Sequence, residues 1–121
     1  MISFISKKEI LGIVRERLNG GLWELDEPLI DIFGKGNELY IEVEIPGVEL
    51  RDIHVVYAGD KIVIYGIKKR VISERGVEYM RAERVFGEFK RVVLLPVAVD
   101  GNKIRSIYKN GVLTVICEKR G

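Results

Sequence analysis

The chain has 121 residues, of which 47% are hydrophobic and 31% charged. This length suits one domain, and the composition is typical of a globular chain, which excludes an intrinsically disordered protein. The 20 basic and 18 acidic residues are interspersed and leave a net charge of +2, so we expect no nucleic-acid partner. No apolar run approaches the roughly 20 residues that span a bilayer, and the first residues do not resemble a signal peptide, so we expect a cytoplasmic protein without a membrane partner.

The sequence offers little for redox, metal or acid–base chemistry. Cys117 is the single cysteine and His54 the single histidine, so an internal disulfide and the usual Cys/His metal spacings are excluded. Glu42 and Glu44 share one face of a predicted strand, but nothing there predicts an enclosing pocket that would raise either pKa. We therefore predict no enzyme activity, no metal and no cofactor. The absence of Gln beside abundant Lys, Arg and Glu favours a thermophilic source.

An amphipathic helix is predicted near the start of the chain, over about 6–19. Ser6 and Glu9 form a capping box at its beginning, and Asn19-Gly20-Gly21 provides its end. Apolar residues recur between them at helical spacing. Such a helix either presents its apolar face to other proteins or packs it against the domain, and the sequence leaves both possibilities open.

From Pro28 onward the hydrophobic period changes from about 3.6 to 2, which predicts strands. The clearest is ELYIEVEI (38–45), in which alternate residues are apolar. The further predicted strands are 29–33, 53–57, 61–65, 89–95, 103–108 and 112–117. Gly, Asn, Asp and Pro separate them, and AGD (58–60) and KNG (109–111) suit tight hairpin turns. Seven short strands with regular turns predict a β-sandwich or barrel.

The stretch 66–88 is too long for a hairpin loop in so small a domain, which indicates that it has a role of its own. It contains VEYMRAERV (77–85), a run that can form a further strand. We expect this strand to pair outside its own core, by exchange with a second copy of the chain.

Several motifs occur in an order that is specific to one family. They are EIPGV (44–48), DIHV (52–55), ERVFGEFKR (83–91), LP (95–96) and YKNGVLTV (108–115). Together they resemble the small heat-shock proteins, in particular their bacterial and archaeal branch. The resemblance implies an α-crystallin domain over 28–119, preceded by an N-terminal helical segment (1–27) and followed by a short end (120–121) without the Ile-x-Ile tail of the family.

The resemblance implies an all-β fold, an immunoglobulin-like antiparallel β-sandwich, that acts as an ATP-independent chaperone. Such a holdase binds partly unfolded client proteins and prevents their aggregation. The resemblance also implies a homodimer in which a strand at about 77–86 is exchanged. The residues implied at the dimer interface are Tyr79, Arg81, Glu83, Arg84, Phe89 and Arg91. A solvated strand charge is the alternative explanation for Arg91.

In the family, a C-terminal tail docks in a groove on a neighbouring dimer. The residues that the resemblance implies for this groove are Ile53, Val55, Tyr57, Arg105 and Ile107. The sequence leaves open which face of these strands lines it. Without a tail of its own, we expect the chain to form a dimer or small oligomer whose groove is free for the tail of another small heat-shock protein.

Client binding is expected at apolar residues of the first segment, because a holdase needs adaptable apolar surface that is shielded at rest. The candidate client contacts are Phe4, Ile5, Leu11, Val14, Leu18 and Trp23. The alternative function is that of a non-holdase adaptor or co-chaperone, which docks one folded partner or a partner's tail through the same sandwich.

Overall fold

The computed structural model describes residues 2–4, 28–70 and 75–121. Within these ranges the chain forms eight strands and one short 3-10 helix, η1 (Leu50–Asp52). The strands are β1 (Ile2–Phe4), β2 (Ile30–Lys35), β3 (Glu38–Glu44), β4 (Ile53–Tyr57), β5 (Lys61–Lys68), β6 (Gly87–Leu94), β7 (Val99–Lys109) and β8 (Val112–Lys119). The seven predicted strands are confirmed with ends shifted by a few residues, and β1 is an additional strand that the sequence pattern did not predict.

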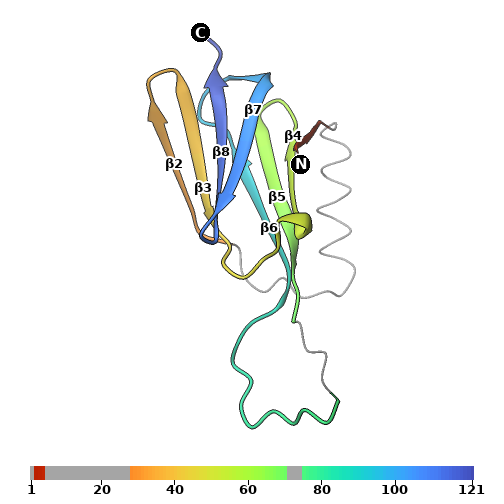
Figure 1. Ribbon diagram of the computed structural model, residues 1–121. Helices are drawn as coiled ribbons and strands as arrows, with labels where there is room; N and C mark the ends of the chain where they lie inside the picture. The colour runs from red at the N-terminus through yellow and green to blue at the C-terminus, as the bar shows by residue number, and fades with distance from the viewer. Residues whose placement is uncertain (1, 5–27, 71–74) are drawn as a thin grey trace.

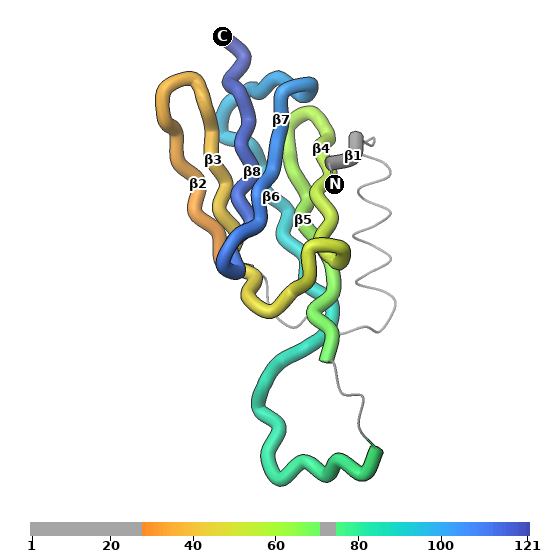
Figure 2. The backbone as a smooth tube through the Cα atoms, viewed as in Figure 1, coloured from red at the N-terminus to blue at the C-terminus, as the bar shows by residue number. Residues whose placement is uncertain are grey.

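The strands build two four-stranded sheets that lie face to face (Figures 1 and 2). Sheet A has the order β1-β4-β5-β6, and sheet B has the order β2-β3-β8-β7. Among the described strands every neighbouring pair is antiparallel except β1 and β4, which run parallel. The predicted all-β antiparallel sandwich is therefore confirmed.

Period-2 alternation explains how the two sheets pack. On β3, Leu39, Ile41 and Val43 are buried, whereas Glu42 and Glu44 lie on the opposite face of the strand. The same alternation in the other strands completes one core between the sheets, whose fully buried members include Val55, Ile62, Ile64, Leu113, Val115 and Cys117. Each buried aliphatic side chain of this kind contributes about 1.5–3 kcal/mol, so this core is the main stabilising element of the fold.

The hairpin between β7 and β8 closes on the predicted turn. Asn110 and Gly111 have φ angles of 53° and 77°, the left-handed conformation that a two-residue hairpin loop requires and that these two residue types adopt readily. Lys109 and Val112 pair directly across this turn. The turn thereby fixes the register of β8, one of the two inner strands of sheet B.

The predicted helix at 6–19 lies outside the described residues. Five of the six candidate client contacts also lie outside them, namely Ile5, Leu11, Val14, Leu18 and Trp23. Phe4, the sixth, belongs to β1, for which the structure describes the backbone pairing with β4.

Candidate protein-interaction site

Strand β4 carries three of the residues predicted to line a groove. Ile53 and Val55 point into the core between the sheets, where they are 3% and 0% exposed. Tyr57, the last residue of β4, packs against the same core and is half-buried. A methyl group placed on Gly101 of β7 would lie 2.5 Å from Cε2 of Tyr57, so the two sheets meet closely at this point. We call the border formed by β4 of sheet A and β7 of sheet B the β4/β7 edge.

The residues of β7 that face β4 are not the ones predicted. Ile104 and Tyr108 pack against the inter-sheet core. Arg105 and Ile107 alternate with them and lie on the outer face of sheet B, where Ile107 is 54% exposed. Arg105 and Ile107 therefore lie on the opposite face of β7 from Ile104 and Tyr108, because successive strand residues point to opposite faces of a sheet. That Arg105 and Ile107 line a tail-binding groove stays a prediction.

On the outer face of sheet B, Arg105 is part of a polar cluster with β3. Its guanidinium Nη2 donates a hydrogen bond of 2.9 Å to Oε2 of Glu38, and the hydroxyl of Tyr40 donates one of 3.0 Å to Oε1 of the same carboxylate. These two bonds, that of Arg105 first, hold the pKa of Glu38 below its ordinary value. The ring of Tyr40 stacks on Phe33 of β2, with centroids 5.0 Å apart. Arg105 therefore joins β7 to β3 across sheet B instead of bordering β4.

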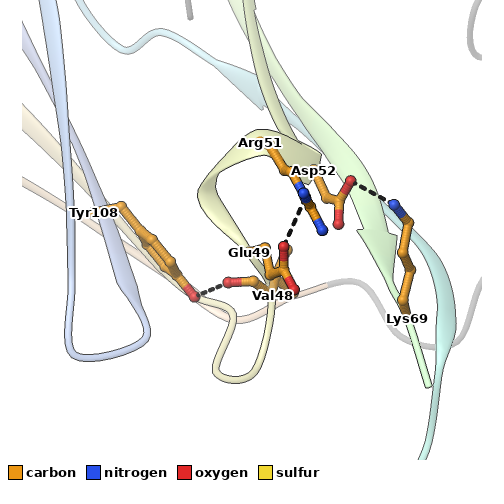
Figure 3. A network of polar contacts seen from close by, with 6 residues as sticks. All are labelled: Val48, Glu49, Arg51, Asp52, Lys69 and Tyr108. Carbon is orange, nitrogen blue, oxygen red and sulfur yellow. Dashed lines mark hydrogen bonds and ion pairs between the residues drawn. The ribbon is translucent and has the colours of Figure 1, made fainter. Parts of the chain in front are cut away.

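The hydroxyl of Tyr108 connects the inner face of β7 to the segment between β3 and β4. Its one proton is shared between the carbonyl oxygens of Ile45, at 2.9 Å, and of Val48, at 2.7 Å. Figure 3 draws the bond to Val48. Burial raises the pKa of this hydroxyl, and the bond to Val48 acts in the opposite direction. Just beyond, Asp52 of η1 pairs with Lys69 after β5 at 3.0 Å. These contacts fix the chain where it enters β4, and thereby one end of the β4/β7 edge.

Strand β1 occupies the outer side of β4. Its register pairs Ile2 with Val55, Ser3 with Val56 and Phe4 with Tyr57 in the parallel sense. It also contacts β7 of the opposite sheet. The first residues of the chain thus lie along the β4/β7 edge, although the sequence predicted that this place is free for a tail.

The segment 75–86 extends away from the two sheets at one end of the sandwich (Figures 1 and 2). None of its residues belongs to a strand. Met80 is 89% exposed and Tyr79 is 48% exposed. Arg81 and Glu83 form an ion pair of 3.7 Å with each other, and both side chains are more than three-quarters exposed. Apolar and charged side chains of this segment therefore face solvent in the single chain.

Arg70 connects the two ends of the projecting segment. Its guanidinium lies over the rings of Phe86 and Tyr79, at 4.3 Å and 4.8 Å from the centroids, and donates a 3.4 Å hydrogen bond to the carbonyl oxygen of Arg84. Arg84 lies over the same Phe86 ring at 4.9 Å. Cation–π contacts at exposed sites contribute about 0.5–1 kcal/mol each. The sequence analysis did not identify Arg70 and Phe86 as residues that hold the segment. The signal in the sequence was a basic residue at one end of the long loop and an aromatic residue at the other.

Two predicted interface residues of β6 lie within the sandwich. Phe89 is 7% exposed and belongs to the inter-sheet core with Val93. The β6 alternation turns the ring of Phe89 inward in the single chain, and its place at a dimer interface stays a prediction. Arg91 is half-buried, and its guanidinium donates a 3.3 Å hydrogen bond to the carbonyl oxygen of Pro28, immediately before β2. Arg91 thereby connects sheet A to the start of sheet B.

Within the described ranges, no group of three or more His, Cys, Asp and Glu side chains is placed to hold a metal ion. Burial raises the pKa of the Cys117 thiol from its ordinary 9.0 to about 11. A protonated thiol is a poor nucleophile and a poor metal ligand, so Cys117 acts as a small apolar core residue. Residues 2–4, 28–70 and 75–121 include no helix long and apolar enough to cross a bilayer.

The geometry is that of a small two-sheet β-sandwich in which β1 pairs with the edge of β4 and the segment 75–86 projects from one end. The sequence model of the Hsp20/alpha crystallin family matches residues 31–121. The chain belongs to the Hsp20/alpha crystallin family, as its motifs predicted.

Individual relatives agree with this assignment. Spore protein SP21 of Stigmatella aurantiaca is 40% identical over 69% of this chain and 50% of its own length. Heat shock protein 16 of Schizosaccharomyces pombe is 33% identical over 85% of this chain and 73% of its own length. The solved structure of heat shock protein 16.0 from Schizosaccharomyces pombe superposes with a TM-score of 0.70, at 32% identity, over 78% of this chain and 87% of that one. The chain thus spans half the length of SP21 and about three-quarters of the yeast protein.

Proposed function

We propose that this protein is an ATP-independent holdase that binds partly unfolded proteins and acts as a strand-exchanged homodimer. The observation that carries the proposal is segment 75–86 of a small heat-shock protein sandwich, which projects from the sheets with Tyr79 and Met80 exposed. An apolar segment that finds no strand partner in its own chain is suited to pair with another chain. Binding, and not catalysis, is the activity that this arrangement supports.

The exchange would place residues 77–86 on a free strand edge of a second copy. Strand β2 is an edge of sheet B, and Phe33 and Ile32 on it are 42% and 38% exposed. Backbone groups along such an edge are available for a further strand. The exposed side chains Arg81 and Glu83, which form an ion pair with each other here, would then exchange partners across the dimer. Tyr79 and Arg84 would pack at this interface.

A dimer experiment tests the exchange. Replacement of residues 77–86 by a Gly/Ser linker of equal length removes the apolar side chains and the ion pair. We expect multi-angle light scattering to give a dimer for the unaltered chain and a monomer for the linker variant. Val97→Ser, at a site 42% exposed and away from the segment, is the matched control and should leave the mass unchanged. A linker variant that keeps the mass of a dimer contradicts the exchange.

Client binding would use exposed apolar surface. On the outer face of sheet A, Val92 and Leu94 of β6 are 38% and 68% exposed, next to the small cluster of Val56, Ala58 and Val63. The further candidate client contacts are those predicted in the first segment: Phe4, Ile5, Leu11, Val14, Leu18 and Trp23. A holdase needs such adaptable patches more than a preorganised pocket, because its clients differ in sequence.

Light scattering from a heat-destabilised client, in the absence of ATP, tests the holdase activity. We expect the protein to suppress aggregation at near-stoichiometric ratios, whereas an inert globular protein at equal mass does not. Val92→Ser together with Leu94→Ser should weaken suppression, and Lys103→Ser, at an exposed polar site of sheet B, should not. No suppression at any ratio would contradict the holdase and favour an adaptor that docks one folded partner.

The β4/β7 edge is proposed as the place where an extended segment of a partner docks. Ile53, Val55 and Tyr57 of β4, with Ile104 and Tyr108 of β7, form the apolar border of this edge. β4 pairs with β5 on one side and with the three-residue strand β1 on the other, so an incoming strand would take the place that β1 holds here. The tail of another small heat-shock protein, with apolar residues two positions apart, suits such a border because alternate residues of a strand share one face.

A further inference from the structure

The pairing between β1 and β4 places a segment of the chain itself at this docking edge. Ile2 and Phe4 hold the register positions of Val55 and Tyr57, which both point toward the core. β1 also contacts β7, so it borders both strands of the β4/β7 edge. Among the described strands this is the one parallel pair in either sheet.

We propose that Ile2–Phe4 is an intramolecular competitor, which occupies the β4/β7 edge and must leave before an extended segment of another protein can pair with β4. This inference rests on the proposed docking at the same edge. The competitor adds a step before partner binding. While Ile2–Phe4 is paired with β4, the β4/β7 edge is covered, and a partner can pair there only after these three residues detach.

The sequence of β1 suits this role. Ile2-Ser3-Phe4 is apolar, polar and apolar, the spacing that a strand needs to present two apolar residues on one face. The partner that displaces it must offer the same chemistry, namely an extended, uncharged backbone with two aliphatic or aromatic side chains two positions apart. An acidic or basic segment does not match, since the inward row on β4 consists of Ile53, Val55 and Tyr57.

The length of β1 makes it displaceable. β1 has three residues, so it forms few backbone hydrogen bonds, and little free energy is needed to open so short a strand. Its pairing with β4 is intramolecular, so it competes with a separate partner at an effective concentration that does not depend on the protein concentration. A site that is occupied by such a competitor nine-tenths of the time binds an external partner about tenfold more weakly than the open site.

Peptide binding tests the competitor. The probe is a fluorescein-labelled synthetic peptide without charged side chains, Gly-Ser-Ile-Ser-Phe-Ser-Gly, titrated by anisotropy into the full chain. The variant is Ile2→Ser with Phe4→Ser, which keeps the length and removes both apolar side chains of β1. The matched control is Lys7→Ser with Lys8→Ser, in the same terminal region but outside β1. Circular dichroism before each titration establishes that the variants remain folded.

We expect the Ile2→Ser, Phe4→Ser variant to bind the peptide about tenfold more tightly than the unaltered chain, and the control variant to bind as the unaltered chain does. Amide chemical shifts of Val55, Val56 and Tyr57 should move on titration. Equal affinity for all three proteins overturns the competitor but leaves docking at the edge intact. Binding to none of them overturns both the docking and the competitor. An affinity that falls as the unaltered protein is concentrated would identify the occupant as the β1 of a second copy, which overturns the intramolecular form.

Discussion

Replacement of Gly66 by alanine should be one of the most destabilising single changes in this fold. Gly66 lies in the middle of β5, paired with Ile53 of β4 on one side and with Phe89 of β6 on the other. A methyl group there would lie 2.0 Å from the carbonyl oxygen of Asp52 and 2.8 Å from Cζ of Phe89. The first neighbour is backbone at the end of η1 and cannot rotate away.

The expected magnitude follows from this geometry. Overpacking a well-packed site costs typically 1–3 kcal/mol and occasionally more, and contact with backbone places Gly66→Ala at about 3 kcal/mol. Such a loss lowers the melting temperature of a domain near 100 residues by about 12–24 °C. Gly34→Ala, on β2, is the matched control, because the nearest atom to its methyl group is the flexible Nζ of Lys119 at 3.0 Å.

The assay is urea unfolding followed by circular dichroism, at one fixed protein concentration because association shifts apparent stability. Gly66→Ala should lower the unfolding midpoint strongly with an unchanged m-value, and Gly34→Ala should change the free energy of unfolding by less than about 1 kcal/mol. If the two variants unfold at the same urea concentration, the steric reasoning is refuted.

Two further predictions concern buried polar groups. Tyr108→Phe leaves the carbonyl oxygens of Ile45 and Val48 without its hydroxyl, so thermal unfolding should show a loss of about 1–3 kcal/mol; an unchanged melting temperature would contradict the role of this bond. Burial raises the pKa of the Cys117 thiol from 9.0 to about 11. The protonated thiol therefore makes its full contribution to the free energy of unfolding below pH 9, and this contribution is lost as the pH rises toward 11. Urea unfolding between pH 8 and pH 11 should therefore show a shallower decline in Cys117→Ala, and an identical decline would argue against a buried thiol.

Several elements around the candidate site could be predicted from local sequence patterns. Alternation in 38–45 and 53–57 identified the strands, and the Asn110-Gly111 turn fixed a hairpin, because both depend on neighbours in the sequence. The length of 66–88 also pointed to the projecting segment (Figure 1). Tyr79 and Met80 of this segment are exposed in the single chain. The exchange of this segment between two copies stays a prediction, since it depends on a second chain.

The sequence by itself determined the strand periods, the turns and, through the order of its motifs, the family. The tertiary structure decided which alternating face meets which partner. Arg105 and Ile107 were expected beside β4, but the packing of sheet B on sheet A directs Ile104 and Tyr108 inward and leaves the other two outside. Pairing of Ile2–Phe4 with β4 was likewise invisible in the sequence, because a three-residue strand has no period of its own and exists only where a free edge receives it.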